Sequence, residues 1–337
     1  MRTLYLCAVL VLAVATLAVV TGCEGPTGPR GAPGESGAAE CFACHFENSE
    51  LLAIEAQWAA SVHATGGNFE RNGSSCAGCH THEGFLAQLA TGSSGSPTNP
   101  SPIHCFTCHE PHTSGDFHLR TQAPVTLTTG GVFDMGHGNL CANCHQSRQH
   151  SPLVAAAPES TSVSGRWGPH HGPQSNMLSG NGGYEFSGYT YGDSPHTRVV
   201  SNGCPSCHMA DPYGAQAGGH TMSMEYEYHE EETPNVAGCN TQDCHRGAVE
   251  DFNYNFAQVE VEALMEDLFT ALQQRGVIDS EGSVVSGKYP EAEAGAYFNY
   301  KFIEEDRSHG IHNTQYTKAL LYSSLAELGV PAPVASR

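Results

Sequence analysis

The sequence has little positive charge and very little lysine. Its 337 residues include 14 lysines and arginines against 35 aspartates and glutamates, which gives a formal net charge of −21 at pH 7. A chain with this balance lacks a basic surface for nucleic acid or for anionic lipid headgroups, so we exclude both as partners. The lysines are only Lys288, Lys301 and Lys318, all of them late in the chain.

Long hydrophobic segments are also scarce. One apolar run, residues 4–20, follows Met1-Arg2 and is shorter than most membrane-spanning helices, which predicts a cleaved secretory signal. The run leads into Val-Thr-Gly-Cys at residues 20–23, which resembles a bacterial lipobox. The resemblance implies cleavage after residue 22 and a lipid on Cys23. The alternative is an ordinary cleaved signal beside an unmodified cysteine.

Cysteine, by contrast, follows a repeated pattern. The sequence Cys-x-x-Cys-His occurs five times, and a sixth copy, residues 239–245, has four residues between its cysteines. This is the attachment pattern of c-type haem, in which two thiols bind one porphyrin and the histidine is the proximal iron ligand. Zinc sites and redox dithiols do not require a histidine directly after each cysteine pair. The predicted cofactors are therefore six haem c groups, attached at Cys41, Cys44, Cys76, Cys79, Cys105, Cys108, Cys141, Cys144, Cys204, Cys207, Cys239 and Cys244, with His45, His80, His109, His145, His208 and His245 as proximal ligands.

The remaining cysteines leave no pair for a structural disulfide. Of the 14 cysteines, only Cys7 and Cys23 lie outside the six sites, and Cys7 lies in the predicted signal. Bacteria attach c-type haem outside the cytoplasm, so the motif and the signal both indicate an exported protein. Lipid anchoring at the outer membrane or cell surface is favoured over a periplasmic location.

Composition divides the chain into four segments. Residues 1–22 are the predicted lipoprotein signal peptide, and residues 23–40 are a lipidated tether with the Gly-X-Y period of collagen. Five triplets are few for a stable triple helix, so an extended spacer is the favoured interpretation. Residues 41–250 are the predicted hexahaem domain, and residues 251–337 a helical section that packs on it and donates a distal histidine.

The fold is expected to be mainly α, with extensive loops and little β-sheet. Hydrophobic residues make up 39% of the chain and glycine occurs 38 times, which is poor material for a conventional core. Six porphyrins would supply the missing apolar surface, so we expect a haem-cored protein. Apolar spacing predicts helices over 50–58 and 261–272 and a last helix after Asn313, whereas 164–194 is expected to be irregular.

Several short motifs resemble distal-ligand elements of multihaem cytochromes. Cys-Phe-Thr-Cys-His-Glu-Pro-His, residues 105–112, resembles an element whose last histidine is commonly distal, which implies that role for His112. His112 lies about 10 Å at most from His109 along the chain, so it would serve a neighbouring haem. Ser-Val-His-Ala, residues 61–64, similarly implies His63, and Gly-Gly-His after the fifth site implies His220.

Further distal candidates come from the same resemblance, which rests on short motifs between residues 41 and 328. His312 lies in a segment similar to the C-terminal distal element of the pentahaem nitrite reductase and hydroxylamine oxidoreductase superfamily. His137 and His171 lie in segments similar to distal elements of extracellular cytochromes from metal-reducing bacteria. His196, in Ser-Pro-His, repeats the spacing of His63.

The resemblance leaves functions from different classes open. The first is an electron carrier for respiratory or extracellular electron transfer, with bis-histidine haems forming a wire to other redox proteins or to extracellular acceptors. The second is an oxidoreductase acting on nitrite, hydroxylamine or another small nitrogen or sulfur species. Such nitrite reductases carry lysine in place of one attachment histidine, and no site here does, which favours the carrier and assigns no catalytic residue. A subunit of a cytochrome filament, which requires self-assembly, is a weaker third option.

Intact mass spectrometry of the purified mature chain should show six haem groups and a lipid on an N-terminal Cys23. The six motifs and the lipobox resemblance are the reasons for this expectation. A gain of five haems would show that the stretched site is not used, and replacing Cys239 and Cys244 with serine provides the matched five-haem reference. A mature chain without added lipid mass would contradict the anchor.

Overall fold

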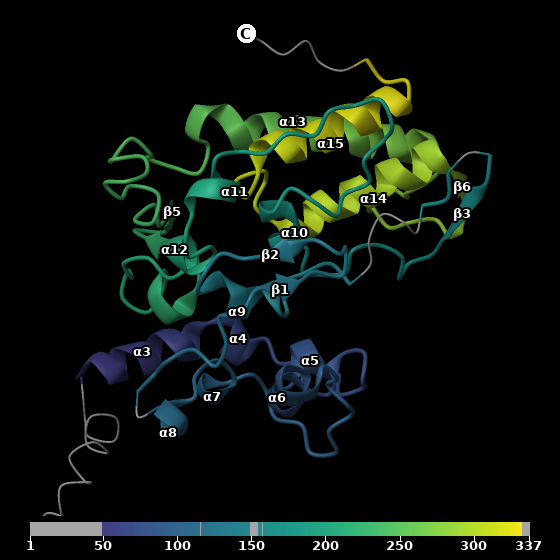
Figure 1. The fold of residues 1–337 in the computed structure, drawn as a ribbon. Coiled ribbons are helices and arrows are strands. Elements are labelled where there is room, and N and C mark those ends of the chain that lie inside the picture. Colours follow the sequence, from purple (N-terminus) through teal and green to yellow (C-terminus); the bar gives the residue numbers. More distant parts are fainter. Residues whose placement is uncertain (1–48, 115, 149–153, 157, 332–337) are drawn as a thin grey trace, which may run out of the picture. The chain divides into compact units, whose positions relative to one another are not determined.

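The computed structural model describes residues 49–114, 116–148, 154–156 and 158–331. All of them belong to Glu47–Arg337, the second of two compact units into which the chain divides. The predicted signal peptide, the tether and the first attachment site therefore lie outside the described residues. Within the described part, helices and loops dominate and strands are short, as the sequence predicts (Figure 1). No helix in that part has the length and hydropathy needed to cross a membrane.

The first half of the described chain consists of short helices joined by loops. The helix expected over 50–58 is confirmed as the longest of them. Four of the short helices lie at attachment sites, and each of them contains at least one attachment cysteine. The elements are α3 (Ser49–Ala60), α4 (Val62–Thr65), α5 (Ala77–His80), α6 (His82–Thr91), α7 (Cys105–Cys108), α8 (Pro111–Ser114), α9 (Gly138–Ala142), α10 (Gln174–Leu178), α11 (His196–Val199), α12 (Pro205–His208) and the 3₁₀ turn η2 (Gly219–Thr221).

In the described part of the chain, the strands form three separate antiparallel pairs. Strands β1 (Val125–Thr126) and β2 (Val132–Phe133) make a minimal hairpin, and β4 (Glu225–Tyr228) pairs with β5 (Glu231–Pro234). The third pair joins distant parts of the chain, because β3 (Ser160–Val163) pairs with β6 (Gly287–Pro290) in the register Ser160↔Pro290. This pair fastens the middle of the chain to the C-terminal helices.

Three long helices make up the C-terminal section: α13 (Ala257–Gln274), α14 (Glu291–Asp306) and α15 (Thr314–Glu327), with the 3₁₀ turn η3 (Tyr254–Phe256) before them. The helices expected over 261–272 and after Asn313 are confirmed. Asn313 caps α15 by accepting a hydrogen bond from the Tyr316 amide, and Gly276 follows α13 with φ +69°. Helix α14 was not predicted, because it is buried on nearly all sides and has no single apolar stripe.

The C-terminal helices carry a conventional hydrophobic core. Fully buried leucines and aromatics from all three helices pack together, among them Leu268, Phe298 and Leu320, and Val163 and Met177 from the middle of the chain join them. The attachment region has a much smaller apolar cluster around Leu127 and Phe133. The expected shortage of a conventional core therefore applies to the attachment region and not to the C-terminal section.

One buried amide links the irregular segment 164–194 to this core. Asn299, fully buried on α14, accepts from the Tyr184 amide at 2.6 Å and donates to the Tyr184 carbonyl and to Ser324 Oγ, each at 2.9 Å. It therefore supplies hydrogen-bond partners to the backbone N–H and C=O of Tyr184, which lie in a loop and pair with no strand. Tertiary contacts therefore hold this part of the segment in place.

Replacing Asn299 with alanine should lower the free energy of unfolding by about 1–3 kcal/mol for each buried group of Tyr184 left without a partner. Chemical unfolding of the haem-loaded protein, followed by circular dichroism, measures the loss. Gln273→Ala, at an exposed position in the last turn of α13, is the control and should change stability by less than about 0.5 kcal/mol. Equal effects of the two substitutions would contradict the assigned role.

Candidate haem attachment and ligation sites

Each described attachment sequence folds into a tight turn closed by one backbone hydrogen bond. In the Cys76, Cys105, Cys141 and Cys204 sites, named here by their first cysteine, the histidine amide donates to the carbonyl of that cysteine at 2.9 to 3.1 Å. Such a turn brings residues three and four positions apart onto one face. Both thiols and the imidazole of each site therefore share a face. All ten described cysteines are free thiols, as thioether attachment requires.

The stretched Cys239 site keeps the same closing bond. The His245 amide donates to the Cys239 carbonyl at 3.0 Å, although two more residues lie between them than in the other sites. The additional residues form an inner turn in which the Thr241 carbonyl accepts from the amides of Cys244 and Arg246. The insertion is thus absorbed between the cysteines, and the first cysteine and the histidine keep their usual relation.

Every described attachment histidine faces a second histidine from a distant part of the chain. The ring centroids of these five pairs are 5.9 to 6.5 Å apart. The pairs are His80–His170 (6.5 Å), His109–His220 (6.2 Å), His145–His63 (5.9 Å), His208–His312 (6.2 Å) and His245–His196 (6.2 Å).

This spacing fits one iron between each pair of rings. A histidine nitrogen lies about 2 Å from a bound metal and about 1.1 Å from its own ring centre, so two rings on opposite sides of one iron have centres about 6.2 Å apart. Two other close pairs do not fit, because His82–His104 are 4.2 Å and His170–His171 are 4.8 Å apart. Among the described residues, no group of three or more histidine, cysteine or acidic side chains forms a metal site of protein ligands alone. A haem needs only two protein ligands, since the porphyrin supplies the others.

Helices α3 and α4 position two of the facing histidines. Ser61 caps α4 by accepting from the Ala64 amide at 3.2 Å, and the Trp58 ring stacks on His63 at 6.0 Å. The side-chain oxygen of the buried Gln57 accepts a hydrogen bond from the His220 backbone amide at 3.0 Å. A side chain at Gly219 would collide with the side-chain amide of Gln57. These contacts explain why the Ser-x-His and Gly-Gly-His motifs accompany His63 and His220.

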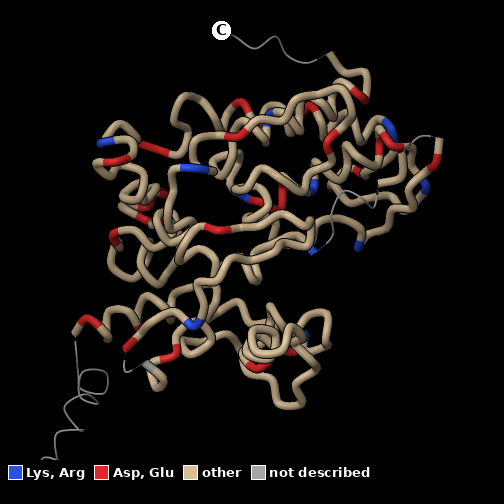
Figure 2. Tube along the Cα trace, in the orientation of Figure 1, with Lys and Arg blue, Asp and Glu red and all other residues tan. Residues whose placement is uncertain are grey.

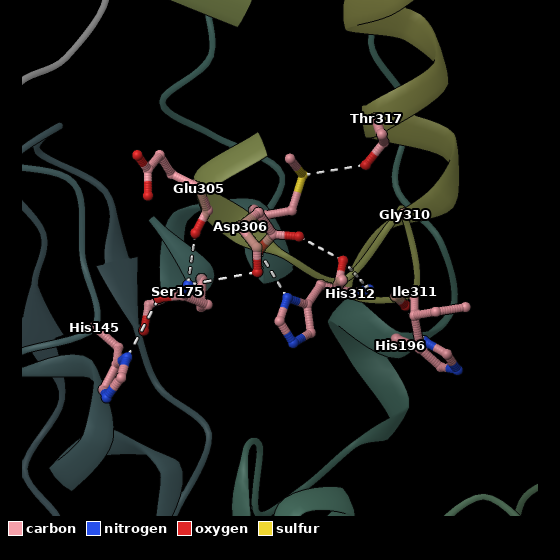
Figure 3. Close-up of polar contacts among 12 residues, drawn as sticks. His145, Ser175, His196, Glu305, Asp306, Gly310, Ile311, His312 and Thr317 are labelled. Atoms are coloured by element: carbon pink, nitrogen blue, oxygen red, sulfur yellow. Dashed lines mark hydrogen bonds and ion pairs between the residues drawn. The ribbon is translucent and has the colours of Figure 1, made fainter. Parts of the chain in front are cut away.

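Residues at the end of α14 and in the segment between α14 and α15 orient two further histidines, His196 and His312 (Figure 3). The His196 Nδ1 donates to the Ile311 carbonyl at 2.9 Å, so its Nε2 carries a free lone pair. The His312 Nδ1 lies 2.7 Å from Asp306 Oδ1, at the end of α14. One short segment therefore orients the facing histidines of both the Cys204 and the Cys239 sites.

The C-terminal end of α14 also reaches the Cys141 site through Gln174. The Gln174 Oε1 lies 3.3 Å from His145 Nδ1, and its Nε2 donates to the carbonyls of Glu305 at 2.9 Å and Asp306 at 3.4 Å (Figure 3). A glutamine of α10 thus connects an attachment histidine to the C-terminal end of α14.

Burial keeps most of these imidazoles neutral. It lowers the pKa of His63 to about 4, with a contribution from His145, and lowers that of His170 to about 4, with contributions from Arg148 and neighbouring histidines. A neutral imidazole keeps the lone pair that binds iron. His312 differs, because burial lowers its pKa but the charge and hydrogen bond of Asp306 outweigh burial and raise it.

The attachment sites adjoin one another through their backbones and thiols. The Cys144 Sγ lies 3.7 Å from the Gly78 carbonyl, and the Cys79 Sγ lies 4.0 Å from the Asn143 carbonyl, so the Cys76 and Cys141 sites are neighbours. Burial raises the pKa of the Cys108 thiol to about 12, with a contribution from Cys141. This contribution indicates that the Cys105 site also lies near the Cys141 site.

Two glycines allow close backbone approaches between sites. A Cβ on Gly138, in α9, would lie 3.1 Å from the Cys204 amide nitrogen, so α9 packs directly against the Cys204 site. A Cβ on Gly238 would lie 2.5 Å from the Ser206 carbonyl oxygen, so the Cys239 site packs against the Cys204 site. The glycines beside His137 therefore have a packing reason that is independent of that histidine.

Three of the expected distal histidines do not face a described attachment histidine. His112 is exposed and contacts the Phe106 ring at 5.9 Å, and His137 is exposed at the start of α9. His171 pairs with Glu305 at 2.8 Å, and its neighbour His170 faces His80 instead. His170 has a φ of +70°, a local conformation that the sequence Pro-His-His-Gly-Pro does not reveal. The Cys41 site, with Cys44 and His45, lies outside the described residues.

Comparison with known proteins relates this fold to that of a cytochrome. No protein-family model and no curated protein matches the chain. A solved structure does match: the outer cell wall cytochrome OcwA aligns with a TM-score of 0.52 and 21% sequence identity. The alignment covers 81% of this chain and 49% of that protein, so the chain spans about half the length of OcwA. At this identity the likeness concerns the fold.

Replacing His170 with alanine should convert one haem of the purified protein from low to high spin, because it removes the ring that faces His80. His171→Ala is the matched control on the adjacent residue and should leave all haems low-spin. The absorption spectrum and electron paramagnetic resonance of the oxidised protein report the spin state. A high-spin haem in His171→Ala alone would reverse the assignment.

Proposed function

We propose that this protein is a multihaem c-type cytochrome that carries electrons through six covalently attached, bis-histidine haems. The observation that carries the proposal is the set of five histidine pairs, each with the spacing of two ligands on one iron. The six attachment motifs and the cytochrome fold of OcwA support it independently.

Paired histidines suit a carrier better than an enzyme. Haem c supplies an iron that changes oxidation state by one electron. Two histidine ligands leave no open coordination position for a substrate, and all five described attachment histidines have a facing partner. We propose His63, His170, His196, His220 and His312 as the distal ligands of those sites. For the Cys41 site, His112 and His137 stay as the proposed partners.

The contacts between sites suggest an order for the wire. We propose that electrons pass between the Cys239, Cys204 and Cys141 sites in sequence, and that the path forks at Cys141 toward the Cys76 and Cys105 sites. The close approaches at Gly238 and Gly138 support the first two steps. The contact of Cys144 with Gly78 and the electrostatic effect of Cys141 on the pKa of Cys108 support the fork.

We further propose that the protein works at the cell exterior, anchored through lipid on Cys23. The lipobox resemblance and the outer cell wall location named for OcwA support this placement. Acidic residues outnumber basic ones and are spread over helices and loops of the described chain (Figure 2), which suits partners with cationic surfaces. The proposed partners are other redox proteins or extracellular acceptors.

Electron paramagnetic resonance of the oxidised protein tests the carrier against the enzyme. All irons should be low-spin, and adding nitrite or hydroxylamine should change nothing, because every axial position is filled. His196→Ala is the positive control and should produce one high-spin haem that responds to added ligand. A stoichiometric high-spin signal in the native protein that shifts with nitrite or hydroxylamine would overturn the carrier and favour the oxidoreductase.

A further inference from the structure

The hydrogen bonds on the ring nitrogens distinguish one histidine from the others. Among the ten histidines of the five pairs, five have an Nδ1 partner within the described residues, and four of these partners are neutral oxygens. The neutral partners are the carbonyls of Phe117, Met222 and Ile311 and the amide oxygen of Gln174. The fifth partner is a carboxylate, that of Asp306 on His312.

The Asp306 carboxyl group lies directly beside this ring. Its side chain is only 1% exposed, and the Oδ1 atom lies 2.7 Å from His312 Nδ1. The Ser308 hydroxyl donates to the other carboxylate oxygen, and the same hydroxyl accepts from the His312 amide at 3.2 Å. In the described part of the chain, Asp306 makes no ion pair with lysine or arginine. Its charge is therefore directed at His312.

We propose that Asp306 is a positioning residue that makes the haem of the Cys204 site the most reducing of the five described sites. The inference rests on the proposed function, because it requires His312 to be an iron ligand. A carboxylate that accepts a hydrogen bond from the Nδ1–H makes the imidazole a stronger electron donor to the iron. This favours the oxidised iron. A buried negative charge also stabilises the oxidised iron, since little solvent screens the attraction.

The position of this haem gives the carboxylate a role in the wire. The Cys204 site adjoins both the Cys141 and the Cys239 sites, so an electron passing between them has to cross it. A low-potential centre between two others raises the energy of that crossing in both directions. Asp306 would therefore limit how fast the Cys239 end exchanges electrons with the fork at Cys141.

Asp306→Asn in the full haem-loaded chain tests the assignment. Asparagine keeps the shape and the accepting oxygen but removes the charge, so a spectroelectrochemical titration should show one of the six haems shifted to a higher midpoint potential, with all haems still low-spin. Glu304→Gln is the matched control, because it removes the same charge two residues earlier, where the partner is Lys301. The control should titrate like the native protein.

A second variant tests the same inference without removing Asp306, in case Asp306→Asn does not fold. Ser308→Ala leaves the carboxylate but removes a hydroxyl that donates to it. More of the carboxylate's negative charge then acts on His312, so one midpoint potential should fall. Unchanged titrations in both variants would overturn the proposal. A high-spin haem in Asp306→Asn would also overturn it, since Asp306 would then hold the ligand in place without tuning it. A stoichiometric high-spin haem in the native protein would instead count against the proposed function.

Discussion

The described attachment region depends on bringing a second histidine to about 6 Å from each of its attachment histidines. An attachment turn is local and needs five to seven residues, but its partner ring comes from a distant segment. The chain between them therefore loops outward and returns, which explains the many irregular segments and the scarcity of sheet. Glycines are needed where these returning segments approach one another, as at Gly138 and Gly238.

The C-terminal helices serve as the rigid support for this arrangement. Their apolar core does not depend on prosthetic groups, and from it Asp306 and Ile311 reach the facing histidines of two sites while Gln174 links a third. A ligand needs its ring held in one orientation before iron binds, and a packed helix end supplies that more accurately than a free loop. The division into an attachment region and a supporting region follows from the separate distribution of cysteines and aliphatic residues along the chain.

Sequence patterns predicted the local features well and the long-range ones incompletely. The four described Cys-x-x-Cys-His sequences share one spacing and one closing hydrogen bond, and the motifs around His63 and His220 correspond to capping and close-packing contacts. The choice of His170 over His171 depends on a left-handed backbone residue, which no short motif encodes. Helix α14 was missed because burial on nearly all sides removes the periodic pattern that marks an amphipathic helix. The neighbour relations of the sites could not be predicted either, because they arise from packing between segments far apart in sequence.

The buried carboxylate and the fork of the proposed wire lie at one structural joint. Gln174 bonds to His145 at the fork and to the carbonyl of Asp306, so the two sites share a rigid connection. His145 and His312 also influence each other electrostatically, because both are buried where solvent screens charge weakly. A change of charge at one of these sites is therefore felt at the other. Adjacent redox centres in such surroundings do not titrate independently. In the proposed wire the end of α14 would therefore affect both haems, and the Cys204 haem more strongly, because the Asp306 carboxylate contacts His312 directly.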